Sequence, residues 1–64
     1  MYLVRIVGPA GKESYLFRGR EVPMDCATRY SSPSAAKRAL VEYHPEKFGL
    51  YGDVLDENDP ERRL

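Results

Sequence analysis

Two side chains in this sequence could act as a nucleophile and a base, Cys26 and His44. A cysteine–histidine pair does chemistry only when a third group orients the base and donors stabilise an oxyanion. The sequence has no pattern for either. A single cysteine beside a predicted strand is usually a small buried apolar side chain, and a histidine at a helix end usually interacts with the helix dipole. We therefore expect no catalytic residues and no enzymatic activity.

Carboxylates gather near the end of the sequence, where they could bind a cation or a basic partner. They are Asp53, Asp56, Glu57 and Asp59. Their spacing does not match a calcium loop, which places acidic ligands at alternate positions before a glycine, so we expect no metal and no cofactor. With Tyr51 they combine an aromatic anchor with a negative rim, which suits a basic groove on a partner protein. The alternative is a solubilising tail.

Arginines recur in the predicted strands, and a basic sheet surface can bind phosphate groups. Alternation with core candidates places Arg5, Arg18 and Arg29 on the face away from the helix, and Arg20 and Lys12 could extend that face. Arg5, Arg18, Arg20 and Arg29 are the alternative, nucleic-acid-binding site. We favour a merely solvated sheet face. The net charge is zero, and the aromatic residues that could stack on bases are expected in the core.

Size and charge limit the functions that the chain can have. Its 64 residues make one domain at most, with a core too small to house a deep enzyme pocket easily. One cysteine excludes an internal disulfide, no apolar run has the length of a membrane span, and we expect no secretion signal because residues 1–7 lack a basic region and a cleavage site. We expect a cytoplasmic protein. The zero net charge conceals a basic part, residues 1–50 (eight Lys/Arg, five Asp/Glu), and an acidic part, residues 51–64 (two Lys/Arg, five Asp/Glu).

The order of the elements predicts an α+β fold. Residues 2–7 and 14–18 read as a hairpin, residues 26–30 as a third strand and residues 50–55 as a last strand. Ser32 is a candidate N-cap before Pro33, and a helix over residues 33–43 ends at His44 because Pro45 follows. We expect a small antiparallel sheet of two to four strands packed on one helix. Residues 1–55 form the domain, and residues 56–64 a frayed polar tail.

The helix has a stripe of apolar residues that predicts its buried face. Ala36, Ala39, Leu40 and Tyr43 recur at helical spacing. On the sheet side, the residues expected to face this stripe are Val4, Ile6, Tyr15 and Phe17.

A basic and aromatic hairpin, then the segment ATRYSSP at residues 27–33 and an alanine-rich helix, resembles many short uncharacterised proteins of bacteriophages and mobile elements. The resemblance covers residues 2–44 and implies a class in which inhibitors of host defence are common, including anti-CRISPR-type inhibitors. We expect a non-enzymatic module that binds and inhibits a larger host or bacterial protein, its acidic segment mimicking nucleic-acid phosphates. The alternatives are a small nucleic-acid-binding module and a structural homodimer.

Overall fold

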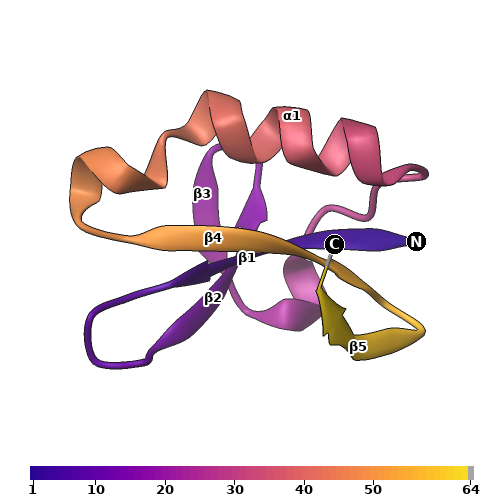
Figure 1. Cartoon of the computed structure of the whole chain (residues 1–64), viewed down its shortest axis with the longest axis horizontal. Coiled ribbons are helices and arrows are strands. Elements are labelled where there is room, and N and C mark those ends of the chain that lie inside the picture. The colour runs from indigo at the N-terminus through magenta and orange to yellow at the C-terminus, as the bar shows by residue number, and fades with distance from the viewer. Residues whose placement is uncertain (64) are drawn as a thin grey trace.

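One helix lies across one face of a five-stranded antiparallel sheet, in the computed structural model that describes residues 1–63, with side chains as far as Asp59 (Figure 1). The strand order is β3-β2-β1-β4-β5. The strands are β1 (Tyr2–Val7), β2 (Glu13–Phe17), β3 (Arg20–Val22), β4 (Tyr51–Asp56) and β5 (Asp59–Arg63). The helix is α1 (Pro33–Tyr43), and the short 3₁₀ helices are η1 (Met24–Cys26) and η2 (Pro45–Phe48). The predicted α+β class is confirmed.

The start of α1 is built as the sequence predicts. Ser32 has an extended backbone and its Oγ accepts a hydrogen bond of 3.2 Å from the amide of Ala35, while Pro33 takes the first helical position. The serine oxygen thus accepts from an amide that has no acceptor within the helix. Pro33 has no backbone N–H, so the first helical position leaves no amide unpaired. The helix therefore begins at a fixed residue.

The end of α1 is also where the sequence predicts it. His44 has a φ of 55°, in the left-handed region, and its amide donates to the carbonyl of Leu40. Because Pro45 cannot continue the helix, the chain turns into η2, which ends at Gly49 with a φ of 71°. These two left-handed residues reverse the chain so that β4 returns beneath α1.

The core between α1 and the sheet confirms the helix stripe and corrects one strand. Val4, Ile6 and Val54 are buried against Ala36, and Ala39, Leu40 and Tyr43 pack at the edge of this cluster. In β2 the buried residue is Leu16, whereas Tyr15 and Phe17 lie on the opposite face. The prediction that Tyr15 and Phe17 pack under the helix is wrong by one residue of register, because Leu16 alone fills that site.

Three other expectations about the sheet need correction. Residues 26–30 do not form a strand: they make one bridge, in which Tyr30 and Tyr2 exchange two backbone hydrogen bonds of 2.8 Å. The third strand in sequence is β3, which forms a hairpin with β2 through the two-residue turn Arg18–Gly19. Residues 59–63, expected in a frayed tail, form β5 beside β4, so the sheet has five strands and not two to four.

The sheet face away from α1 is only partly covered. Leu3 and Leu55 are cross-strand partners on this face and both are buried. The segment that carries η1 and the buried Ala27 passes on this side of the sheet (Figure 1). At the other end of the same face lie Arg5 and Tyr15, which are only partly buried. Side chains on this second face are therefore free to interact with one another across the strands.

Gly52 is the point at which α1 and β4 come closest. A Cβ built on Gly52 would lie 2.5 Å from Leu40 Cδ1 and 2.9 Å from the backbone oxygen of Arg5. Real Cβ atoms do not approach other heavy atoms so closely, and the second of these neighbours is backbone in the central strand. The absence of a side chain at residue 52 is therefore what allows the helix to sit on the sheet.

Replacing Gly52 by alanine should destabilise the fold through overpacking. We expect Gly52→Ala to lower the free energy of unfolding by about 1–3 kcal/mol, which corresponds to roughly 4–8 °C in melting temperature for each kcal/mol in a domain of this size. Gly8→Ala is the matched control, because its new Cβ would meet only ordinary contacts of 3.6 Å or more. Urea denaturation measures both, and equal effects would show that the helix is not held at this distance.

Candidate interaction surface

The first of the expected acidic residues is part of an ion-pair network. Arg5 makes a two-pronged contact with Asp53, from Nε to Oδ1 at 3.1 Å and from Nη2 to Oδ2 at 2.7 Å. Its Nη1 donates to Glu13 Oε2 at 3.1 Å. The three residues come from β4, β1 and β2, and the side chains of Arg5 and Asp53 are only 12% and 16% exposed. Asp53 was expected in solvent, and the structure corrects that placement.

The hydrogen bonds of this network affect acid–base behaviour. The pKa of Arg5 is raised, chiefly because its guanidinium donates to the Asp53 carboxylate. The pKa of the neighbouring Tyr15 is raised by burial and by the negative charge of Glu13. Arg5 is therefore already occupied by two carboxylates, those of Asp53 and Glu13.

A second ion pair joins the other expected sites. Arg29 Nε donates to Glu57 Oε2 at 2.7 Å. The backbone amide of Glu57 also donates to the carbonyl of Met1 at 2.9 Å. The Asp56 carboxylate accepts from the amide of Asn58 at 2.9 Å and thereby supports the turn between β4 and β5. Asp59, the first residue of β5, is exposed.

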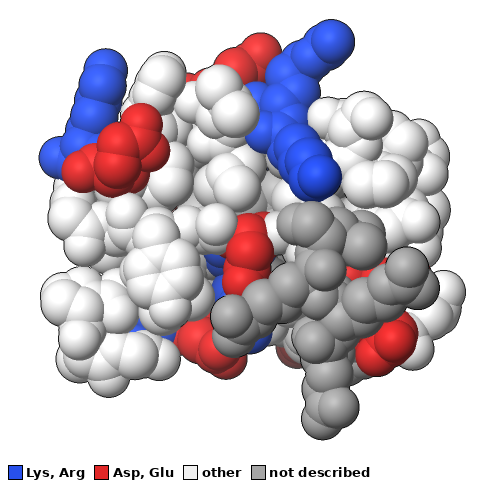
Figure 2. Space-filling model, in the orientation of Figure 1, with Lys and Arg blue, Asp and Glu red and all other residues white. Residues whose placement is uncertain are grey.

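The acidic residues are divided between two places. Asp53 lies in the Arg5 network, whereas Asp56, Glu57 and Asp59 lie together at the β4–β5 turn, where Asp56 and Asp59 are cross-strand partners. Tyr51, which is 60% exposed, lies at the start of β4, and Glu57 follows the end of that strand. Glu57 is six positions further along the chain than Tyr51, which corresponds to roughly 20 Å of extended backbone. In Figure 2 the acidic and basic side chains of the visible face are interspersed. Tyr51 therefore lies apart from the three carboxylates at the β4–β5 turn.

The arginines of the alternative site are dispersed as well. Arg5 lies on the face away from α1, as predicted, but it is paired. Arg29 lies outside any strand and is also paired. Arg18 has left β2 for the turn, and Arg20 begins β3 on the other side of that turn. Two arginines of the four thus remain together, at the β2–β3 turn.

The two candidate catalytic side chains lie on opposite sides of the sheet. Cys26 is an exposed residue of η1, and His44 follows the last residue of α1 (Figure 1). His44 Nδ1 lies 3.1 Å from Glu46 Oε1, on the surface. Within the described part of the chain, no group of three His, Cys, Asp or Glu side chains is arranged to hold a metal ion.

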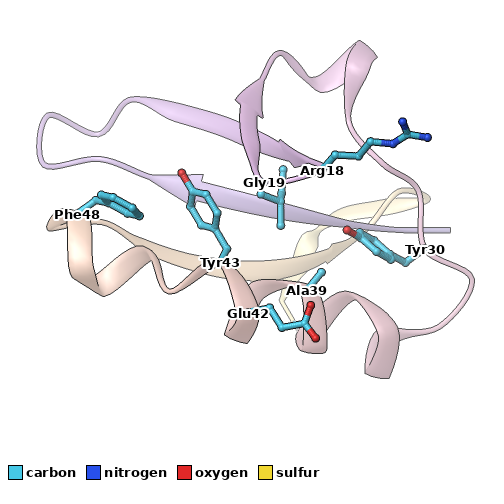
Figure 3. Close-up of a pocket in the computed structure, with 8 residues that line it drawn as sticks. Arg18, Gly19, Tyr30, Ala39, Glu42, Tyr43 and Phe48 are labelled. Carbon is cyan, nitrogen blue, oxygen red and sulfur yellow. The ribbon is translucent and has the colours of Figure 1, made fainter.

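A groove that the sequence analysis did not identify lies between α1 and the β2–β3 hairpin (Figure 3). Its volume is about 510 Å³. Leu16, Ala39 and the rings of Tyr30, Tyr43 and Phe48 supply its apolar surface, and Arg18 and Glu42 supply its charges. The volume is typical of sites that receive a small molecule or the side chains of a partner.

Tyr43 holds one side of this groove in place. Its hydroxyl donates to Glu21 Oε2 at 2.8 Å, and Ser14 Oγ donates to the other oxygen of the same carboxylate. The pKa of Tyr43 is raised by burial and by this hydrogen bond. Its ring also contacts Phe48, with centroids 5.8 Å apart. Tyr43 thereby bridges α1, η2 and β3, and Phe48 remains 64% exposed.

No single stretch of sequence predicts the groove, because its residues come from four separate segments. Each of its aromatic residues, taken alone, is typical of a core position. The signal that could have pointed to it is the pair Arg18–Gly19 between two strand-like runs, which predicts a two-residue hairpin turn at that point.

Comparison with known proteins adds no assignment. No protein-family model, curated protein or solved structure matches the chain. Among the described residues, no helix has the length and apolar character needed to cross a membrane.

The two ion pairs should differ in their contribution to stability. We expect Asp53→Ala to lower the free energy of unfolding by about 1.5–3 kcal/mol, because it leaves a mostly buried guanidinium without its principal partner. Glu57→Ala should cost less than about 1 kcal/mol, because the Arg29–Glu57 pair is 42% and 34% exposed. Urea denaturation of the two variants measures the difference, and equal losses would contradict it.

Arg18 is in a conformation that suits asparagine better. Its φ is 49° and that of Gly19 is 77°, as in the hairpin turns that prefer Asn-Gly. Arg18→Asn should raise the free energy of unfolding by about 0.5–1 kcal/mol, since relief of about 1–2 kcal/mol of strain exceeds the lost contact with Phe17. Arg18→Lys keeps the strain and should give no gain. A thermal melt in which Arg18→Asn is less stable than the parent would refute this.

Proposed function

We propose that this chain is a non-enzymatic protein-interaction module that binds a larger host or bacterial protein through the groove between α1 and the β2–β3 hairpin. The observation that carries the proposal is the composition of the groove, in which three aromatic rings and an arginine line one hollow. Tyrosine and arginine are the residue types that dominate binding energy in protein interfaces, particularly around a pocket that excludes water.

The surface beside the groove supports a protein partner over a small molecule. Phe48 and Val41 are 64% and 66% exposed near the end of α1. A second hollow, of about 360 Å³, lies beside the same part of the helix and includes Val41, Pro45 and Leu50. A partner that covered both hollows would bury an apolar surface wider than one small ligand could cover.

An inhibitory role is consistent with the size of the domain. A stable interface takes about 800 Å² from each partner, which is roughly a fifth of the 4388 Å² surface of this chain. A domain with extents of 27 × 21 × 20 Å would then block an area of its partner without adding chemistry of its own. Origin in a phage or mobile element, and action against a host defence, are parts of this proposal.

Nucleic-acid binding is the second candidate, and one observation favours it. Tyr15 and Phe17 lie on the sheet face away from α1, where Arg20 is also placed by its pairing with Phe17. Exposed aromatic residues beside arginines are typical of single-stranded nucleic-acid sites. Against it, Arg5 is already neutralised on that face by two carboxylates.

A photo-crosslinking experiment can distinguish the surfaces. Benzoylphenylalanine would replace one of three exposed aromatic residues: Phe48 at the groove, Tyr51 near the acidic segment or Phe17 on the opposite sheet face. In a bacterial lysate we expect a discrete protein adduct from Phe48 and little from Phe17. Tyr51 also lines the second hollow, so it should form a protein adduct only if Phe48 does.

Other adducts would indicate other functions. A protein adduct from Tyr51 alone would place the binding site at the acidic segment. A nucleic-acid adduct from Phe17 would favour nucleic-acid binding, the second candidate function. An adduct of two copies of this chain would indicate a homodimer. Any of these three results without a Phe48 adduct contradicts the proposed surface.

A further inference from the structure

Arg18 is the charged residue that the hairpin contributes to the groove (Figure 3). Its guanidinium carbon lies 5.4 Å from the centroid of the Phe17 ring. Among the described side chains, no carboxylate lies within ion-pair distance of Arg18. The ring restrains the side chain, so less rotamer entropy is lost when the guanidinium binds an anion.

The backbone at Arg18 is a second, independent observation. Its φ of 49° is sparsely populated by residues with a side chain, and the fold requires only a tight turn there. Glycine or asparagine would make that turn with less strain. Strained residues of this kind concentrate at ligand clamps, and Arg18 lies at the edge of an apolar groove. An arginine at residue 18 is therefore better explained by ligand binding than by a requirement of the turn.

The charges around the groove are unequal on its two walls. On the hairpin wall the charged lining residue is Arg18, and the nearby Glu21 carboxylate already accepts hydrogen bonds from Ser14 and Tyr43. On the helix wall the charged lining residue is Glu42. An anionic group is therefore attracted to the hairpin wall and repelled from the helix wall.

We infer that the groove receives a segment of the partner protein in which an apolar side chain adjoins an aspartate or glutamate. The apolar side chain packs against Tyr30, Tyr43 and Leu16, and the carboxylate pairs with Arg18. Glu42 fixes the direction of the segment, because it disfavours the reverse placement of the carboxylate. This inference rests on the proposed function and adds the chemistry of the partner.

The test is selection from a random peptide library displayed on phage, with the full chain as bait. The parent protein should enrich peptides that carry Asp or Glu next to an aromatic or aliphatic residue. Arg18→Asn, which keeps the turn, should bind those peptides about tenfold to a hundredfold more weakly, as expected for the loss of one charge-assisted contact. Arg18→Glu should enrich peptides with Lys or Arg at the same place.

Two controls separate this inference from the proposed function. Phe48→Ala alters the groove without changing its charge, and Arg38→Glu changes a charge on α1 outside the lining of the groove. The peptides should lose affinity for Phe48→Ala and keep it for Arg38→Glu. Folding of every variant is checked by its amide NMR spectrum.

The outcomes are distinguishable. Groove-dependent peptides without acidic enrichment, or equal affinity for the parent and Arg18→Asn, would overturn the partner chemistry and leave the proposed function standing. No peptide that depends on Phe48 would overturn both. Labelled oligothymidine is the last probe: if it binds at low salt and loses binding in Arg18→Asn, the anion is a nucleic-acid phosphate and not a carboxylate.

Discussion

One helix of eleven residues must cover a sheet of five strands, and it is too small to do so. An α-helix is about 10 Å wide and this one is about 16 Å long, while neighbouring strands lie about 4.8 Å apart. The helix packs on β1 and β4, where Gly52 lets it approach closely. The strands β2 and β3 are left without a helix above them, and the space beside the helix becomes the groove. The groove thus exists because α1 does not cover the whole sheet.

The opposite face of the sheet is not covered by α1, and there ion pairs between the strands occupy the partly buried positions. Arg5 lies in the central strand with Asp53 and Glu13 on either side. Three polar side chains that satisfy one another can occupy a partly buried position without a covering element. The same pairs also remove charge from the surface, since Arg5 and Arg29 each neutralise a carboxylate of the acidic segment. Two carboxylates of the acidic part of the sequence are thus paired with arginines of its basic part.

The sequence was informative wherever a local rule decides the structure. The Ser32–Pro33 cap, the helix stripe and the stop at His44–Pro45 each depend on neighbours within a few residues, and they were predicted correctly. The register of β2 was not, because Tyr15, Leu16 and Phe17 are all apolar enough to face a core. Which of them is buried depends on where α1 lies. The groove was not predicted either, because Tyr30, Tyr43 and Phe48 are far apart in the sequence and line the same groove only in the folded chain.

The position of β1 between β2 and β4 has a consequence for the order of folding. The meander β1–β2–β3 joins neighbours in sequence, and hairpins of this kind form within microseconds. The pairing of β1 with β4 joins residues as far apart as Tyr2 and Asp56, and closing so long a loop is slower. Until β4 arrives, one edge of the most apolar strand is unpaired and Val4 and Ile6 lack most of their cover. Intermolecular strand pairing through β1 is therefore the main hazard during synthesis of this chain.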